Sequence, residues 1–296
     1  MWKMKILITG ASGFVGRNVK EYLQKNKAYE IHSPSSKELN CIDERCVTEY
    51  LKKHLFDYVL HFAVYGYGTD KNQDTNKILE YNLRIFYNFA KNSSCYGRML
   101  YVGSGAEYDK RYDISGVTEE EIGRTIPVDP YGLMKYVVGQ HIEQSKNIYN
   151  LRLFGIFGKY EAYSTKFISN VCCKALKDIP LSIRQNVYFD YLWVEDFCRM
   201  LEIFLHNELQ YHTYNTVLGR RISLCEICDI VKKLCGKELP VFVCREGLGK
   251  EYTASNERFR KEFPEFQYTP IEKAIQNLYQ WYQANDNIDI YQLLYS

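Results

Sequence analysis

The types and spacing of Tyr131 and Lys135 suit these two side chains to acid–base chemistry. They stand four positions apart in a segment that predicts a helix from Tyr131 to about Lys146, so both side chains leave the same helix face. A free phenol titrates at about pH 10, which is too high for proton transfer at neutral pH. The neighbouring ammonium favours the phenolate and is expected to lower the pKa of Tyr131. The pair therefore predicts a site that exchanges a proton with a substrate oxygen.

A third polar residue, Ser104, follows the apolar run Met99–Gly103, which predicts a buried strand. Parallel sheets bind their ligands at the carboxyl ends of the strands, and Ser104 stands at such an end. Its hydroxyl is expected to hold and orient the substrate oxygen. We therefore predict that Ser104, Tyr131 and Lys135 form the catalytic set.

A glycine-rich turn, Gly10–Gly16, lies between the predicted strand Ile6–Thr9 and a predicted helix, Val15–Lys25. Glycines in such a turn allow a tight bend, close approach to a pyrophosphate, and close packing of the helix on the strand. The N–H groups and the positive dipole at the helix N-terminus favour that anion. The turn predicts a bound nicotinamide dinucleotide, whose nicotinamide ribose Lys135 can reach. The residues expected to hold it here are Gly10, Ser12, Gly13, Phe14, Val15 and Gly16, with Tyr131 and Lys135 at the nicotinamide end.

The segment after the second predicted strand, Tyr29–His32, indicates which dinucleotide to expect. A carboxylate there would accept the ribose hydroxyls of NAD(H) and repel the 2′-phosphate of NADP(H). The sequence has no acid in this segment before Glu38, and its hydroxyls and ammonium suit a phosphate. We therefore favour NADP(H) and keep NAD(H) as the alternative. The residues placed to bind this end are Ser33, Ser35 and Lys37 for the phosphate and Asp43 for the adenine amino group.

Short apolar runs alternate with helical patterns through the first half of the chain, which is typical of a parallel α/β sheet. Further strands are predicted at 58–63, 99–103 and 150–154, and helices at 46–54, 78–92 and 131–146. From about Gly158 the pattern changes to helices at 194–206, 223–235 and 270–284, with a strand near 214–218. We predict a Rossmann doubly wound parallel sheet with a smaller C-terminal α/β cap. The predicted domains are residues 1–165, with a return segment at about 187–220, and an interleaved cap at 166–296.

Composition argues against several classes of partner. The 296 residues include 38 basic and 36 acidic side chains, a net charge of +2, which gives no reason to expect nucleic acid. The sequence shows neither a secretory signal nor an apolar run of about 18 residues, so we expect no membrane partner. Cys225 and Cys228 lie in a helical pattern without a second pair, and no metal site is predicted. Reduced cysteines and no signal suggest the cytoplasm.

Further segments resemble the extended short-chain dehydrogenase/reductase family, whose members act on nucleotide sugars. The similarity extends over residues 5–220. Met134 stands where the family has Ser, and Gly155 where it has Asn. The matching blocks are the glycine turn, His61-Phe62-Ala63, Tyr81-Asn82-Leu83, Val102–Tyr108, Pro130–Lys135, Arg152–Gly158 and Asp190–Asp196.

The resemblance implies further site residues and partners. It implies that Phe62, Ala63 and Asn82 contribute to the dinucleotide site. It also implies a nucleotide-diphosphate sugar as substrate, bound by the cap, and a homodimer in which helices at about 78–92 and 131–146 form a four-helix bundle. The residues expected to meet the substrate are Ser104, Gly105, Ala106 and Tyr131 in the core, with the basic side chains Lys166, Arg184 and Arg258 in the cap.

The resemblance also narrows the reaction. A 4,6-dehydratase of this family would have Asp and Glu after the catalytic Ser, where this chain has Gly105 and Ala106; Glu107 is one place too far. An epimerising reductase of the GDP-fucose synthase type would have Cys in place of Ala106, and a His that is absent from residues 158–163. A 4-keto reductase and a 4-epimerase with tightly bound NAD remain. The NADP-like segment, the short chain and a similarity of residues 33–43 to GDP-fucose synthases favour the reductase.

A different class of function is a sensor that binds the dinucleotide without turnover. Such proteins usually lose the Tyr or the Lys, and this chain keeps both Tyr131 and Lys135. We therefore expect an enzyme.

Overall fold

Six parallel strands form the central sheet, in the order β10-β6-β4-β3-β1-β2. The computed structural model describes residues 3–66 and 74–294. Contacts divide the chain into two units, and the central sheet belongs to the first, which holds residues 1–111, 119–153 and 198–216. Its strands are β1 (Met4–Thr9), β2 (Tyr29–His32), β3 (Phe56–His61), β4 (Tyr96–Ser104), β6 (Ile148–Leu153) and β10 (Thr213–Thr216).

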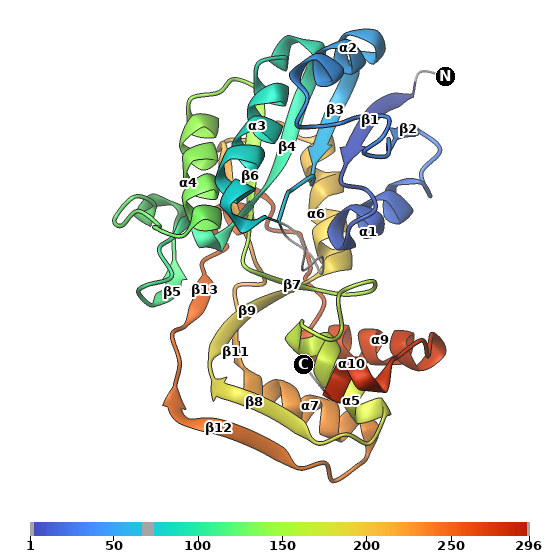
Figure 1. Ribbon diagram of the computed structural model, residues 1–296, viewed down its shortest axis with the longest axis vertical. Coiled ribbons are helices and arrows are strands. Elements are labelled where there is room, and N and C mark those ends of the chain that lie inside the picture. Colours follow the sequence, from blue (N-terminus) through green and yellow to red (C-terminus); the bar gives the residue numbers. More distant parts are fainter. Residues whose placement is uncertain (1–2, 67–73, 295–296) are drawn as a thin grey trace. The chain divides into compact units, whose positions relative to one another are not determined.

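Helices cover both faces of this sheet (Figure 1). On one face α2, α3 and α4 lie side by side. On the other face α1 is joined to α6 by a hydrogen bond from Tyr22 to Glu202 at 2.7 Å. The helices are α1 (Phe14–Leu23), α2 (Glu44–His54), α3 (Ile78–Ala90), α4 (Pro130–Glu143) and α6 (Val194–His206), the last of which begins in the second unit. The predicted doubly wound α/β fold is confirmed.

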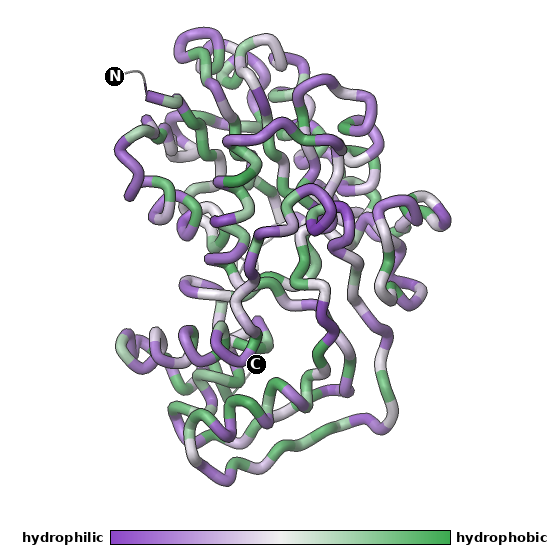
Figure 2. The backbone as a smooth tube through the Cα atoms, turned by 180° about the vertical axis from the view of Figure 1, so that it is seen from behind, coloured by the Kyte–Doolittle hydropathy of each residue, from purple (hydrophilic) through white to green (hydrophobic). Residues whose placement is uncertain are grey.

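One part of the core of the first unit lies between the sheet and the helices α2 to α4. Phe86 and Phe89 of α3 and Met134 and Val138 of α4 are buried against Met99 of β4. Figure 2 shows that the strand segments inside this layer are mainly hydrophobic. Burial of both faces explains why these strands appear in the sequence as continuous apolar runs rather than alternating patterns.

The second unit holds residues 112–118, 154–197 and 217–296. Its main sheet has the order β11-β9-β13-β5, with β7 paired to β9, and β8 and β12 form a separate parallel pair. The strands are β5 (Ile114–Val117), β7 (Gly155–Phe157), β8 (Leu181–Asn186), β9 (Tyr188–Trp193), β11 (Arg221–Ser223), β12 (Val241–Leu248) and β13 (Tyr252–Ala254). The helices are α5 (Phe167–Leu176), α7 (Leu224–Cys235), α8 (Glu257–Glu262), α9 (Ile271–Ala284) and α10 (Ile290–Leu294).

The unit boundaries differ from the predicted domains. The predicted return segment, 187–220, is divided: β10 joins the central sheet beside β6, whereas β9 pairs with strands of the second unit. Residues 154–165 belong to the second unit because β7 pairs with β9. Residues 112–118 also belong there, since β5 pairs with β13. In each case a strand partner distant in sequence decides the boundary.

Candidate active site

The glycine turn has the backbone shape that a dinucleotide cradle needs. Gly10 has φ +66°, and a Cβ there would lie 2.8 Å from the backbone nitrogen of Ala63. A Cβ on Gly16 would collide with the carbonyl oxygen of Gly10. The N-cap of α1 is Gly13, and no described side chain caps that helix end. Glycine at these positions leaves room for a pyrophosphate against the helix N-terminus, so the residues present fit a dinucleotide.

Thr9, at the end of β1, fixes the neighbouring strand end. Its Oγ1 accepts hydrogen bonds from the backbone N–H groups of Phe62 and Ala63, both at 3.2 Å. The same oxygen lies 3.1 Å from Nδ1 of His61, which is fully buried. These contacts hold the predicted cofactor residues Phe62 and Ala63 directly against Gly10. Thr9 is absent from the predicted site residues, although its place at the strand end beside the glycine turn is a usable signal in the sequence.

The side chain of Asn82, which the resemblance assigned to the cofactor, is hydrogen-bonded to a loop. Its amide accepts from the N–H of Tyr65 at 2.8 Å and donates to the carbonyl of Tyr65 at 2.8 Å and to that of Ile78 at 2.7 Å. The side chain therefore ties the backbone after β3 to α3. A role of Asn82 toward the dinucleotide stays a prediction.

At the predicted adenosine end, Ser35 and Asp43 are both engaged by the protein. The hydroxyl and the N–H of Ser35 donate to Glu38, each at 2.8 Å, and the hydrogen bonds lower the pKa of that carboxyl. Asp43 is the N-cap of α2 and accepts from the N–H of Cys46 at 3.0 Å. Ser33 is half-buried and Lys37 is exposed. Binding of a phosphate by Ser33, Ser35 and Lys37 stays a prediction.

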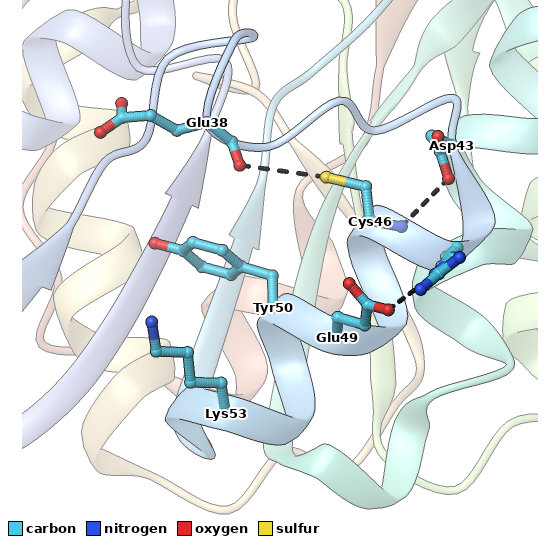
Figure 3. Close-up of a pocket in the computed structure, with 7 residues that line it drawn as sticks. Glu38, Asp43, Cys46, Glu49, Tyr50 and Lys53 are labelled. Atoms are coloured by element: carbon cyan, nitrogen blue, oxygen red, sulfur yellow. Dashed lines mark hydrogen bonds and ion pairs between the residues drawn. The ribbon is translucent and has the colours of Figure 1, made fainter.

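A shallow depression of about 360 Å³ runs along the outer side of α2 (Figure 3). Asp43 and Glu38 line it, together with Tyr50 and Lys53. Its lining includes none of Ser33, Ser35 and Lys37. Three carboxylates, of Glu38, Asp43 and Glu49, and two basic side chains, of Arg45 and Lys53, line the depression, which shares only Asp43 with the predicted cofactor residues.

Ser104 ends β4 and caps the single 3-10 turn Gly105–Glu107. Its Oγ accepts a hydrogen bond from the N–H of Ala106 at 3.1 Å, which leaves its O–H as a donor. The start of α4 lies against this turn, since a Cβ on Gly132 would be 2.8 Å from the carbonyl oxygen of Ala106. Asp129 caps α4 by accepting from the N–H of Gly132 at 2.8 Å, and Pro130 suits the first helical position. The local sequence therefore brings Tyr131 beside the Ser104 turn.

Lys135 lies buried beneath Tyr131. Its Nζ is 5.8 Å from the centre of the Tyr131 ring. Nζ donates to Oη of Tyr101 at 2.8 Å and to the carbonyl of Val102 at 2.6 Å. Burial lowers the pKa of Lys135 to about 7, and the negative charge of Glu107 opposes this shift. The predicted trio Ser104, Tyr131 and Lys135 thus occupies one small part of the first unit.

A buried ion pair, Glu107–Arg152, supports the turn that carries Ser104. Nε of Arg152 donates to Glu107 at 2.8 Å, and the exposed fractions of the two side chains are 2% and 0%. Glu107 also accepts from the N–H of Ser104 at 3.1 Å and from the amide of Asn150 at 3.1 Å. A Cβ on Gly139 of α4 would lie 2.7 Å from Oε2 of Glu107, so glycine there admits the carboxylate. Glu107 is therefore held in an ion pair with Arg152 and is not a free acid beside Ser104.

The predicted cap residues lie on three different elements of the second unit. Lys166 precedes α5 and is half-buried, Arg184 is exposed on β8, and Arg258 is half-buried in α8. Their role toward an anionic substrate stays a prediction.

Comparison with known proteins agrees with this arrangement of residues. The family model described as the NAD dependent epimerase/dehydratase family matches residues 6–216, which include the glycine turn and the predicted catalytic trio. The chain belongs to this family. GDP-L-colitose synthase of Yersinia pseudotuberculosis is 26% identical over 97% of this chain and 100% of its own length.

Two solved structures of similar proteins share the fold. A GDP-L-fucose synthetase from Naegleria fowleri, bound to NADP, has 18% identity and a TM-score of 0.79, over 97% of this chain and 96% of its own. A GDP-mannoheptose C4 reductase from Campylobacter jejuni, also with NADP bound, has 18% identity and a TM-score of 0.80, over 95% and 98% of the two chains. Among the described residues of this chain, no helix is long and apolar enough to cross a membrane.

Proposed function

We propose that the protein is an NADP(H)-dependent reductase of a nucleotide-diphosphate sugar that carries a keto group at C4. The observation that carries the proposal is the trio of Ser104, Tyr131 and Lys135, beside which the carboxylate of Glu107 is held by Arg152. The names of the similar proteins support a GDP sugar as the first substrate to test, and two of the solved structures hold NADP.

The reduction needs a hydride and a proton, and the bound dinucleotide supplies the hydride. Tyr131 donates its phenol proton to the oxygen of the C4 carbonyl as that oxygen gains negative charge. Ser104, whose oxygen already accepts from Ala106, donates its O–H to the same oxygen and orients it. The ammonium of Lys135 stabilises the phenolate left on Tyr131 and binds the nicotinamide ribose.

Dehydration is disfavoured by the surroundings of Ser104. The next two residues, Gly105 and Ala106, have no acid–base group, and the carboxylate of Glu107 is held by Arg152 at 2.8 Å. Removing Glu107 from that pair would leave a buried, uncompensated guanidinium, which costs about 3–5 kcal/mol. No proton carrier for C5 and C6 is therefore at hand in the described core.

A 4-epimerase is the second candidate, because it uses the same trio with tightly held NAD. Denaturing the purified protein and identifying any released nucleotide separates the two. A reductase is expected to exchange NADPH with solution and to release little. Stoichiometric NAD released on denaturation would favour the epimerase.

The direct test of the proposed function is NADPH oxidation on addition of a GDP-linked 4-keto-6-deoxy sugar. In Tyr131→Phe we expect kcat/KM to fall by about 10²–10⁴-fold with NADPH binding retained, because the proton donor is lost. Tyr136→Phe, which changes a half-buried tyrosine on the same helix, is the control and should keep its activity. Turnover that survives in Tyr131→Phe would remove Tyr131 from the chemistry.

The proposal includes a homodimer and a cytoplasmic location. Leu83 and Tyr87 of α3 line an open depression of about 370 Å³, so part of this helix face is accessible for a second copy. Bundling of α3 and α4 from two protomers would cover it. All ten cysteines are free thiols, which suits a reducing compartment.

A further inference from the structure

A second tyrosine, Tyr101, contacts the lysine of the proposed catalytic trio. It lies on β4, three residues before Ser104, and only 4% of it is exposed. Its Oη accepts a hydrogen bond from Nζ of Lys135 at 2.8 Å. The same Nζ is 4.3 Å from the centre of the Tyr101 ring, so the ammonium also lies over the aromatic face. Both contacts favour the charged form of Lys135.

Contacts on its other sides hold Tyr101 in this position. Its O–H lies 3.8 Å from Sδ of Met134, the residue that replaces the family's Ser. The ring stacks on His61 with centroids 5.8 Å apart and packs edge-on against Phe86 at 5.3 Å. Because the phenol proton points to sulfur, a lone pair of the oxygen faces Lys135. Met134 thus helps to fix the direction in which the hydroxyl of Tyr101 faces Lys135.

We infer that Tyr101 is a positioning residue that holds the Lys135 ammonium charged and correctly oriented for the dinucleotide and Tyr131. An ammonium has three N–H donors. Among the described residues, Oη of Tyr101 and the carbonyl of Val102 take two of them, which leaves one directed elsewhere. The inference rests on the proposed function only for what that third donor binds.

The other titratable groups that face Lys135 lie on several different elements. Tyr131 faces Lys135 from the same helix, Glu107 faces it from the turn after β4, and His61 faces it from β3. Burial lowers the pKa of His61 to about 3, so this ring is neutral. Burial raises the pKa of Tyr101 well above its ordinary value, so its phenol keeps its proton. Tyr101 therefore acts on Lys135 as a dipole and not as a charge.

The test is a titration of Lys135 itself in the free protein, followed by NMR of ¹³Cε-labelled lysine. The Lys135 signal is assigned from its loss in Lys135→Arg. In Tyr101→Phe we expect the pKa of Lys135 to fall by about one unit, since a hydrogen bond to the ammonium is lost. Above neutral pH the affinity for NADPH is expected to fall by about tenfold for the same reason.

Tyr96→Phe is the matched control, because Tyr96 is a buried tyrosine on the same strand whose hydroxyl donates to the carbonyl of Phe89 at 3.0 Å. A structural loss alone would affect both variants, whereas the titration should shift only in Tyr101→Phe. Replacing Tyr101 by 3-fluorotyrosine keeps the side-chain size and weakens the acceptor. It should shift the pKa in the same direction by less, and it keeps the test open if Tyr101→Phe fails to fold.

An unchanged Lys135 titration in folded Tyr101→Phe, or in the fluorotyrosine protein, would overturn the inference. The titration needs no substrate, so its result is independent of whether a 4-keto sugar is reduced. Absence of turnover in the wild-type protein would instead count against the proposed function alone.

Discussion

Lys135 links the chemistry of this protein to its stability. Burial lowers its pKa from an ordinary 10.5 to about 7 in the folded chain. Between these two values the unfolded chain binds a proton that the folded chain releases, so folding becomes more favourable as pH rises. Below about pH 7 both states are protonated, and this dependence disappears.

We therefore predict how Lys135→Met changes with pH. The free energy of unfolding of the wild type, relative to this variant, should rise by about 1 kcal/mol per pH unit from pH 7 towards pH 10. Urea unfolding at a series of pH values measures it, and Lys53→Met, which removes an exposed lysine, corrects for the rest of the chain. A difference that stays level across this range would mean that Lys135 is charged and well solvated in the fold.

At the scale of residues, the sequence could predict where the three proposed catalytic groups lie but not which residues support them. Tyr131, Lys135 and Ser104 follow from type and spacing, because a helix face and a strand end fix where they lie. Tyr101 and Glu107 could not be recognised in this way. Each is one polar residue in a buried segment, and its role depends on partners that only the folded chain brings close, namely Lys135 and Arg152.

Among the elements, the turn between β1 and α1 has the tightest steric requirements of the cofactor site. Gly10 and Gly236 both have positive φ, at +66° and +65°. A Cβ on Gly10 meets the backbone of Phe62 and Ala63 at 2.8 Å, whereas a Cβ on Gly236 meets nothing within 4 Å. Alanine substitutions at these two positions therefore separate the cost of backbone strain from the cost of a steric collision.

Gly10→Ala should cost both stability and NADPH binding, whereas Gly236→Ala should cost only the strain of a left-handed alanine, about 1–2 kcal/mol. For Gly10→Ala we expect a larger loss and a Kd for NADPH raised by at least about tenfold, since the strand end must move. Thermal unfolding and fluorescence titration with NADPH measure the two effects. Equal results for both variants would show that the contact with Phe62 and Ala63 is unimportant.

The central sheet could be predicted from the sequence, and the strands of the second unit could not. β1, β3, β4 and β6 are apolar runs between helical patterns, so their type and order follow from local sequence. β13 has three residues and pairs with β5, far away along the chain, and β12 is largely exposed along its length. Such strands have no local signature, because their partners and not their side-chain pattern define them.

For the whole molecule, the proposed dimer can be tested on α3. Leu83→Glu places a charge on the face that a second copy would cover, so we expect the dimer to dissociate to monomers that keep their fold. Sedimentation equilibrium measures the mass, and Arg45→Glu, on the exposed side of α2, is the control. A wild-type monomer at micromolar concentration, or a dimer that persists in Leu83→Glu, would contradict this arrangement.

The measurement that tests the central claim most directly follows one hydrogen atom. The protein is incubated with a GDP-linked 4-keto-6-deoxy sugar and NADPH that carries deuterium at the transferred position. We predict one deuterium at C4 of the sugar product for each NADPH oxidised, and loss of this transfer in Tyr131→Phe. No deuterium at C4 and no oxidation of NADPH would contradict the account, and a change of configuration at C4 when a GDP-hexose replaces the keto sugar would indicate an epimerase.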